Sequence, residues 1–176
     1  MSNILYIVVP CYNEQEVLPE TSKRLREKVQ TLRQSGKIDA DSRILFVNDG
    51  SKDATWEMMQ KLYEENSVFS GVNLSRNRGH QNALLAGIAV AAEHADMIVS
   101  MDADLQDDVD AMDRMIDAYE AGNDIVYGVR SSRQKDTFFK RNTAQLFYRM
   151  LHFLGAEIVY LSLIHISEPT RLALIS

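Results

Sequence analysis

Two carboxylates separated by one residue, Asp102 and Asp104, directly follow an apolar run that ends at Met101. In an extended segment such residues lie on the same side, so their charges repel each other unless a cation lies between them. Carboxylate oxygens are the ligands that Mg²⁺ and Mn²⁺ prefer, and magnesium completes its shell with water and substrate phosphates. The pair therefore indicates a divalent metal site, although similar pairs are also common in solvated loops.

A second group of polar and aromatic residues, in the segment PCYNE, follows the first apolar run. Pro10 has no backbone N–H, so we expect it to end the hydrogen-bond ladder of that strand. Tyr12 and Glu14 then form a platform suited to a nucleotide base. The alternative is an ordinary helix-entry loop in which Asn13 caps the helix.

Two further clusters follow the next two apolar runs. Asp49 can accept hydrogen bonds from a base N–H or a ribose hydroxyl, whereas a plain turn explains Gly50 but not Asp49. Arg76 and Arg78 can neutralise phosphate charge. His80, close by, is interpreted as a surface or capping residue rather than a ligand.

Basic residues are concentrated between positions 130 and 154, in a chain whose formal net charge is −6. Apolar residues of the same stretch fall largely on one helical face, and basic amphipathic helices of this kind lie in the lipid interface. We therefore predict contact with a membrane surface and a lipid phosphate through Arg130, Arg133, Lys140 and Arg141. The alternative is a core-packing helix with a solvated basic side.

Several classes of protein are disfavoured. The phosphate-binding sequences G-x-G-x-x-G and G-x-x-x-x-G-K-[ST] are absent, which argues against a dinucleotide oxidoreductase and a P-loop nucleotidase. The acidic net charge argues against a nucleic-acid partner. The single cysteine, Cys11, allows no intramolecular disulfide and fits a reducing cytoplasm. No apolar run approaches the roughly 18 residues that a membrane span requires.

Apolar runs alternate with segments of helical periodicity along most of the chain. Strands are expected at residues 4–9, 43–47, 69–74, 96–101 and 124–129, and helices at 18–32, 53–65, 80–92 and 110–121. This alternation predicts an α/β fold with a mostly parallel, Rossmann-like sheet and helices on both faces. Ligands bind such sheets at the carboxyl ends of the strands, where each polar cluster begins, so we expect the clusters to converge on one edge.

The ordered set VVPCYNE, VNDGSKD, SRNRGHQNAL and MDADLQD resembles family 2 glycosyltransferases with the GT-A fold. The likeness is closest to the polyprenyl-phosphate branch, which includes bactoprenol-phosphate glucosyltransferases and dolichol-phosphate mannosyltransferases. It covers about residues 3–160, and four motifs in the same order make it specific. That branch often has D-L-Q-D/N-P-P where this chain has Asp107-Asp108-Val109.

The resemblance implies transfer of a sugar from a nucleotide diphosphate sugar to a polyprenyl phosphate, with inversion and with Mg²⁺ or Mn²⁺ as cofactor. UDP-glucose is favoured over GDP-mannose. It implies that Asp104 ligates the metal and that Asp102 lies near the ribose and diphosphate, and these two are the predicted catalytic residues. The other predicted nucleotide-binding residues are Pro10, Tyr12, Glu14, Asp49 and Arg76.

This interpretation divides the chain into a nucleotide-sugar-binding GT-A domain (1–135), a basic amphipathic helix beside the membrane (136–160) and a tail (161–176). The tail continues no alternating pattern and resembles the translated read-through of a sequencing adapter, so it is interpreted as non-native, with an ordinary strand and loop as the alternative. Bactoprenol members continue past this point into two transmembrane helices. We therefore expect a protein anchored at the cytoplasmic face of a membrane.

Two other functions stay open. One is a family 2 glycosyltransferase that acts on a soluble acceptor in polysaccharide synthesis, and the other is an inactive, truncated nucleotide-binding fragment. A homo-oligomer is compatible with the sequence, which does not decide the oligomeric state.

Overall fold

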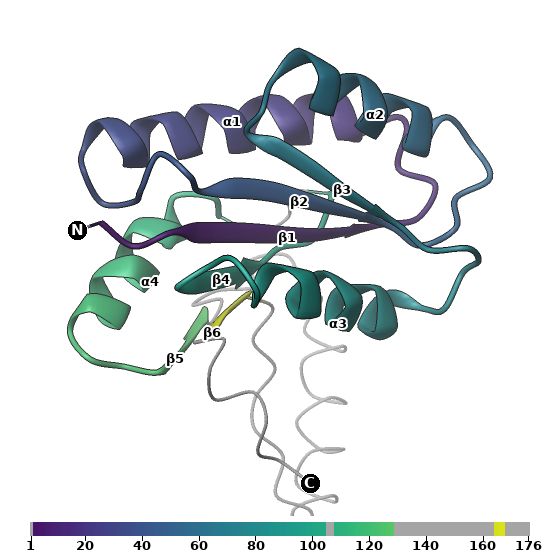
Figure 1. The fold of residues 1–176 in the computed structure, drawn as a ribbon. Coiled ribbons are helices and arrows are strands. Elements are labelled where there is room, and N and C mark those ends of the chain that lie inside the picture. Colours follow the sequence, from purple (N-terminus) through teal and green to yellow (C-terminus); the bar gives the residue numbers. More distant parts are fainter. Residues whose placement is uncertain (1, 105–107, 129–163, 168–176) are drawn as a thin grey trace, which may run out of the picture. The chain divides into compact units, whose positions relative to one another are not determined.

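A computed structural model describes residues 2–104, 108–128 and 164–167. The elements, in chain order, are β1 (Leu5–Cys11), α1 (Leu18–Gln34), β2 (Arg43–Asn48), α2 (Thr55–Glu65), β3 (Phe69–Asn73), α3 (His80–Ala91), β4 (Met97–Ser100), α4 (Ala111–Glu120), β5 (Ile125–Gly128) and β6 (Ile164–Ser167) (Figure 1). Within the described residues, the strands and helices expected from the sequence are present, with ends that differ by no more than about two residues, the usual uncertainty of such boundaries. The basic helix expected at 136–160 lies outside the described residues.

The sheet has the strand order β3-β2-β1-β4-β6-β5. The strands β3, β2, β1 and β4 are parallel, whereas β6 is antiparallel to both β4 and β5. The predicted α/β class with a mostly parallel sheet is therefore confirmed. β6 lies within residues 161–176, where the sequence pattern predicted no strand, because a four-residue antiparallel strand is too short to show a clear pattern of its own. The origin of that segment stays a prediction.

Helices cover both faces of the sheet because its central strands are apolar toward both sides. Ile7 and Val9 of β1 belong to the core that α1, α2 and α4 complete, whereas Val8 belongs to the core beneath α3. Figure 1 shows α1 and α2 on one side of β1 and β2, with α3 on the other. Gly87 lets α3 approach closely, since a Cβ there would lie 2.4 Å from Cγ1 of Val8 and 2.7 Å from Cγ2 of Val47.

β1 continues through Pro10 to Cys11, so the prediction that Pro10 ends the strand is wrong. Pro10 stays in register with β2, whereas pairing with β4 stops at Val8. The carbonyl of Val8 accepts a hydrogen bond from Met101 beyond β4, and that of Cys11 accepts one from Asp49 beyond β2. The backbone N–H and C=O groups of even-numbered residues in β1 therefore point toward β4. Pro10 lies beyond Val8, where pairing with β4 has already ended, so its missing N–H costs no hydrogen bond of the sheet.

Ion pairs fasten α4, which follows the acidic loop after β4, to α1. Lys28 lies 2.8 Å from Asp110 and also contacts Asp113, with its own side chain 10% exposed. Lys37, just beyond α1, lies 2.5 Å from Asp117. Burial raises the pKa of Asp113, but the hydrogen bonds and charges of the two lysines outweigh it and hold that pKa below its ordinary value of 3.8. These ion pairs therefore hold α4, the helix that follows the acidic loop, against α1.

Replacing Lys28 by methionine should lower the free energy of unfolding at pH 7 by about 1–2 kcal/mol, because charge-assisted hydrogen bonds to a largely covered ammonium group are lost. Urea unfolding measures this loss, and K23M, at an exposed lysine of the same helix, is the matched control. Because the pKa of Asp113 is lowered in the folded state, the stabilisation is present above pH 3.8 and is lost as the pH falls toward the lowered pKa. Equal stabilities of wild type and K28M at pH 7 would show that the pairs contribute nothing.

Candidate functional site

The loops that follow β1, β2, β3 and β4 meet at the carboxyl edge of the sheet, as the sequence predicted. They are the β1–α1 loop (12–17), the β2–α2 loop (49–54), the β3–α3 loop (74–79) and the β4–α4 loop (101–110, of which 105–107 are not described). Parallel pairing of the four strands places all these loops on one side of the molecule. Contacts between neighbouring loops then build a single site.

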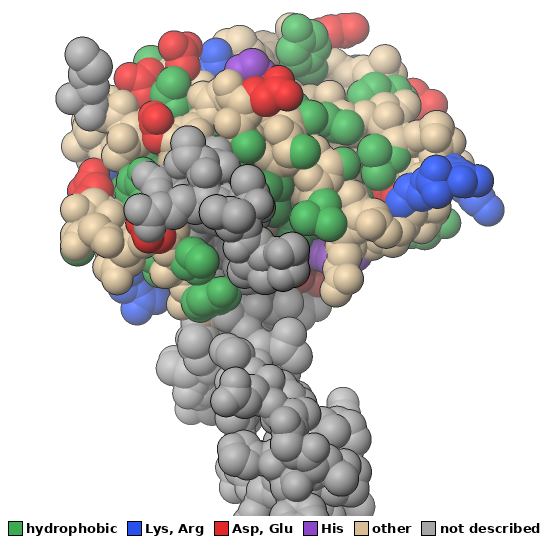
Figure 2. Space-filling model, turned by 60° about the horizontal axis from the view of Figure 1, so that its bottom comes forward, with side chains coloured by type: hydrophobic (Ala, Val, Ile, Leu, Met, Phe, Trp, Pro, Cys, Tyr) green, Lys and Arg blue, Asp and Glu red, His purple; other side chains and the backbone are tan. Residues whose placement is uncertain are grey.

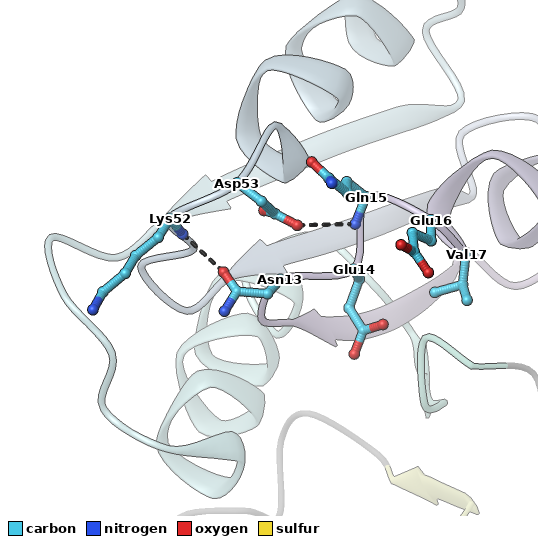
Figure 3. Close-up of a pocket in the computed structure, with 7 residues that line it drawn as sticks. All are labelled: Asn13, Glu14, Gln15, Glu16, Val17, Lys52 and Asp53. Carbon is cyan, nitrogen blue, oxygen red and sulfur yellow. Dashed lines mark hydrogen bonds between the residues drawn. The ribbon is translucent and has the colours of Figure 1, made fainter.

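The β1–α1 and β2–α2 loops are joined by side-chain hydrogen bonds. The N–H of Asn13, a residue with φ +57°, donates to the hydroxyl of Ser51 at 3.0 Å. The side-chain oxygen of Asn13 accepts from the N–H of Lys52 at 2.8 Å, and Asp53 accepts from the N–H of Gln15 at 3.2 Å (Figure 3). Since α1 has no side-chain cap, Asn13 links two loops instead of capping the helix.

Asp49 joins the β2–α2 loop to the β3–α3 loop. Its side chain is buried, and its two oxygens accept hydrogen bonds from the N–H of Arg78 at 2.6 Å and of Gly79 at 2.9 Å. The next residue, Gly50, has φ +65°, and a Cβ there would lie 2.5 Å from the carbonyl carbon of Arg76. The carboxylate therefore fixes the loop that carries Arg76. This role was not predicted, and contact with a base or ribose stays a prediction.

The β3–α3 and β4–α4 loops meet where α3 begins. Nε2 of His80, the first residue of α3, lies 3.6 Å from Oδ1 of Asp102. The His80 side chain is 58% exposed, which agrees with a surface position, yet the sequence did not reveal its contact with Asp102. Ala103 is buried in the core, whereas Asp102 is half-buried and Asp104 is exposed. Residues 103 and 104 form a turn rather than extended backbone, and the shared side of the two aspartates stays a prediction.

Carboxylates from three loops act on one another at this edge. Burial raises the pKa of Glu14, and the negative charges of Asp104, Asp53 and Asp102 raise it further. A divalent cation would relieve that repulsion, and carboxylate oxygens suit Mg²⁺ or Mn²⁺. In the part of the chain that the structure describes, no group of three or more His, Cys, Asp or Glu residues is placed so that it could hold a metal ion. An ion held here would therefore take much of its shell from water and substrate phosphates.

A cavity of about 450 Å³ opens beside Glu14, a volume within the range of small-molecule sites. Figure 3 shows that the β1–α1 and β2–α2 loops form its walls, which are polar. Its lining residues are Asn13, Glu14, Gln15, Glu16, Val17, Lys52 and Asp53. Neither Asp102 nor Asp104 lines it. Because Glu14 belongs both to this cavity and to the acidic group, the cavity adjoins the candidate site without coinciding with it.

Two buried threonines that the sequence analysis missed hold the loops in place. The hydroxyl of Thr55 accepts from the N–H of Glu14 at 2.9 Å and donates to Asp53 at 2.6 Å. The hydroxyl of Thr21 lies 2.5 Å from the carbonyl oxygen of Ala103. Thr21 lies on the apolar face of α1, where a hydroxyl needs a partner, and that position could have revealed it.

The remaining predicted residues take different positions. Pro10 is buried in β1, whereas Tyr12, two residues later, is 40% exposed and can offer a stacking surface. Arg76 is exposed on the β3–α3 loop. The predicted membrane residues Arg130, Arg133, Lys140 and Arg141 lie outside the described residues, as does Asp107.

The described surface adds little on membrane contact. Within residues 2–104 and 108–128, no helix combines the length and apolar character needed to cross a bilayer. Where described atoms are visible in Figure 2, hydrophobic side chains are interspersed with acidic and other side chains over the face that it shows. The large apolar side chains that are exposed are Tyr12, Tyr63, Leu85, Val90, Ile125 and Tyr127. The prediction of membrane contact therefore rests on residues 130–154.

Comparison with known proteins identifies relatives over most of the chain. The family model for glycosyl transferase family 2 matches residues 6–174. The uncharacterized glycosyltransferase YkoT of Bacillus subtilis is 49% identical over 157 residues, which are 89% of this chain and 47% of that protein. The bactoprenol glucosyl transferase of Shigella phage SfV is 36% identical over 144 residues, 82% of this chain and 44% of that one. The chain thus spans less than half the length of these relatives.

Solved structures of glycosyltransferases share the fold. The mannosyltransferase PcManGT from Pyrobaculum calidifontis, in complex with GDP-Man and Mn²⁺, has a TM-score of 0.60 at 18% identity and covers 96% of this chain and 45% of that one. Glucosyl-3-phosphoglycerate synthase from Mycobacterium tuberculosis, in complex with UDP, has a TM-score of 0.61 at 18% identity, covering 96% and 57%. These likenesses confirm the expected GT-A fold. With the fold, the ordered motifs and the family model in agreement, the chain belongs to glycosyl transferase family 2.

Proposed function

We propose that this chain is the nucleotide-sugar-binding part of a glycosyltransferase that moves a sugar from a nucleotide diphosphate sugar to a polyprenyl phosphate. The observation that carries the proposal is the meeting of four motif loops at one sheet edge, where the charges of Asp102 and Asp104 raise the pKa of Glu14 and His80 contacts Asp102. The 36% identity to a bactoprenol glucosyl transferase supports this acceptor class. It also supports glucose as the sugar and, with it, UDP-glucose as the donor.

The donor would bind across the four loops. Tyr12 offers an exposed ring directly beyond β1, so a base can stack there, with Pro10 and Glu14 beside it. Asp49 fixes the loop that presents Arg76, whose guanidinium can pair with phosphate oxygens. The structural neighbours in complex with UDP and GDP-Man support a nucleotide diphosphate as the ligand class.

Asp104 is the proposed metal ligand, and Asp102 the proposed contact for ribose and diphosphate. The exposed position of Asp104 and the mutual repulsion of the carboxylates fit a hard divalent cation, and the neighbour in complex with Mn²⁺ supports metal use. Bound Mg²⁺ or Mn²⁺ would supply charge stabilisation for the departing nucleoside diphosphate. Direct displacement of that group at the anomeric carbon inverts the configuration.

A phosphate acceptor would also reduce the need for a general base. A phosphate monoester has a second pKa near 6, so it is already largely a dianion at pH 7. Such a nucleophile needs less help from a general base than a sugar hydroxyl does. What it needs from the protein is docking by cations at a membrane surface, which residues 130–154 can provide.

The proposal is tested by following radiolabelled sugar from UDP-glucose, with GDP-mannose in parallel, into undecaprenyl phosphate in detergent with Mn²⁺. We expect label in the organic phase, and more of it from UDP-glucose. Label that enters only a water-soluble glycan would favour the soluble-acceptor function. Tight nucleotide binding without transfer to either acceptor would instead favour an inactive nucleotide-binding fragment.

Membrane docking has a separate test. Replacing Lys140 and Arg141 by glutamate should release the chain from anionic vesicles. Each basic residue near an anionic surface contributes about 1 kcal/mol to the free energy of binding, and the substitution turns both attractive charges into repulsive ones. Flotation with anionic and neutral vesicles measures this, with K140R/R141K as the charge-preserving control. Added salt should weaken wild-type binding. Equal recovery with both vesicle types, or none with either, would favour a core-packing helix and a soluble acceptor.

A further inference from the structure

A buried hydroxyl of α1 reaches the backbone between the two site aspartates. The Thr21 side chain is 1% exposed, and its Oγ1 lies 2.5 Å from the carbonyl oxygen of Ala103. Ala103 is itself 4% exposed, whereas Asp104 is exposed. The contact therefore holds the backbone of the residue that lies between Asp102 and Asp104.

The hydroxyl proton belongs to this contact rather than to the helix. Oγ1 of Thr21 also lies 3.0 Å from the carbonyl oxygen of Val17, one turn back. That carbonyl already accepts the N–H groups of Glu20 at 3.1 Å and of Thr21 at 3.0 Å. A hydroxyl has a single proton to donate. The carbonyl oxygen of Ala103 is the closer of the two acceptors and carries the stronger hydrogen bond.

The same first turn of α1 also anchors the β1–α1 loop. The carbonyl oxygen of Glu14 accepts the N–H groups of Val17 at 3.2 Å and Leu18 at 2.9 Å. One end of the helix thus holds the loop with Glu14, and Thr21 holds the loop with Asp102 and Asp104. The distance between these carboxylates depends on a single rigid element.

We propose that Thr21 is a positioning residue of the metal site, because its hydroxyl fixes the Ala103 carbonyl and with it the directions of Asp102 and Asp104. This inference rests on the proposed function. Thr21 touches neither metal nor substrate, and acts only through the backbone. Loss of the hydroxyl should therefore weaken metal binding more than it weakens metal-independent nucleotide binding.

The test measures Mn²⁺ affinity of the full chain in saturating UDP, with free Mn²⁺ followed by electron paramagnetic resonance. T21V, which is isosteric, should raise the Mn²⁺ dissociation constant by about five- to tenfold, the equivalent of one lost hydrogen bond. T21S keeps the hydroxyl and should stay within about twofold of wild type. T31V is the matched control, because Thr31 of the same helix donates at 3.0 Å to its own helix at Glu27 and is exposed.

Each outcome decides one question. The loss of UDP affinity in T21V without Mn²⁺ should be smaller than its loss of Mn²⁺ affinity, whereas a general loosening of the fold would weaken both alike. Unchanged Mn²⁺ affinity in T21V, or equal losses in T21V and T21S, would overturn the role of Thr21. Failure of the wild type itself to bind Mn²⁺ with UDP would overturn the proposed function instead. If T21V does not fold, T21A removes the same hydroxyl and is compared with T21S in the same way.

Discussion

Replacing Asp104 by asparagine should abolish Mn²⁺-dependent nucleotide binding while leaving the chain folded. The substitution keeps the shape of the side chain but removes the charge that a hard cation requires. Asp104 is exposed, so this change should leave the unfolding transition within about 0.5 kcal/mol of wild type. Nucleotide affinity in Mn²⁺ should fall at least about tenfold, to the level measured without metal.

Calorimetric titration of UDP with and without Mn²⁺ measures this effect, and thermal unfolding monitored by circular dichroism checks the fold. D41N is the matched control, because Asp41 is exposed in the loop before β2, at the opposite edge of the sheet. It should bind UDP as the wild type does. Unchanged Mn²⁺ dependence in D104N would remove Asp104 from the metal site.

The second large effect is expected at Asp49. In D49N an amide NH₂ replaces one of the two carboxylate oxygens that accept the N–H groups of Arg78 and Gly79. The NH₂ is itself a donor, so one of these buried N–H groups loses its acceptor. Loss of a charge-assisted hydrogen bond there should lower the free energy of unfolding by about 2–3 kcal/mol. D39N is the matched control. Asp39 also accepts a backbone N–H, that of Asp41 at 2.9 Å, but this hydrogen bond is exposed. Urea unfolding of the two variants should separate them clearly.

The same variant separates two roles of Asp49 in binding. If Asp49 also contacts the base, D49N should weaken UDP and GDP binding by about 1–3 kcal/mol and pyrophosphate binding less. If it acts only by holding the loop that carries Arg76, all three ligands should weaken alike. Wild-type affinity for UDP in D49N would exclude both roles.

The fold could be predicted from the sequence because long-range pairing in a parallel sheet leaves a local signature. Strands buried on both faces, such as β1 and β2, need uninterrupted apolar runs, and the helices between them need one apolar face. The same logic missed β6, which pairs antiparallel across a long separation in sequence. It also misjudged Pro10, because the effect of a missing N–H depends on which neighbouring strand it faces.

Candidate site residues could be proposed from the sequence, but their partners could not. Asp102 and Asp104 were singled out by their spacing, and their roles stay a prediction. The sequence suggested a ligand contact for Asp49, whereas its partners in the structure are backbone N–H groups of Arg78 and Gly79, which no side-chain type reveals. Thr21 was missed for the same reason, since its partner is a carbonyl far along the chain.

The most direct test of the central claim is thermal unfolding of the chain with UDP, GDP and ADP, each with and without Mn²⁺. A ligand that binds only the folded state stabilises it by RT ln(1 + [L]/Kd), about 2.7 kcal/mol at a hundredfold excess over Kd. For a chain of this size that corresponds to a rise in Tm of roughly 5–10 °C. We expect this rise with UDP and Mn²⁺ together, a much smaller one with either alone, and none with ADP. An unchanged Tm with every nucleotide in the presence of Mn²⁺ would contradict a nucleotide-sugar site at this edge of the sheet.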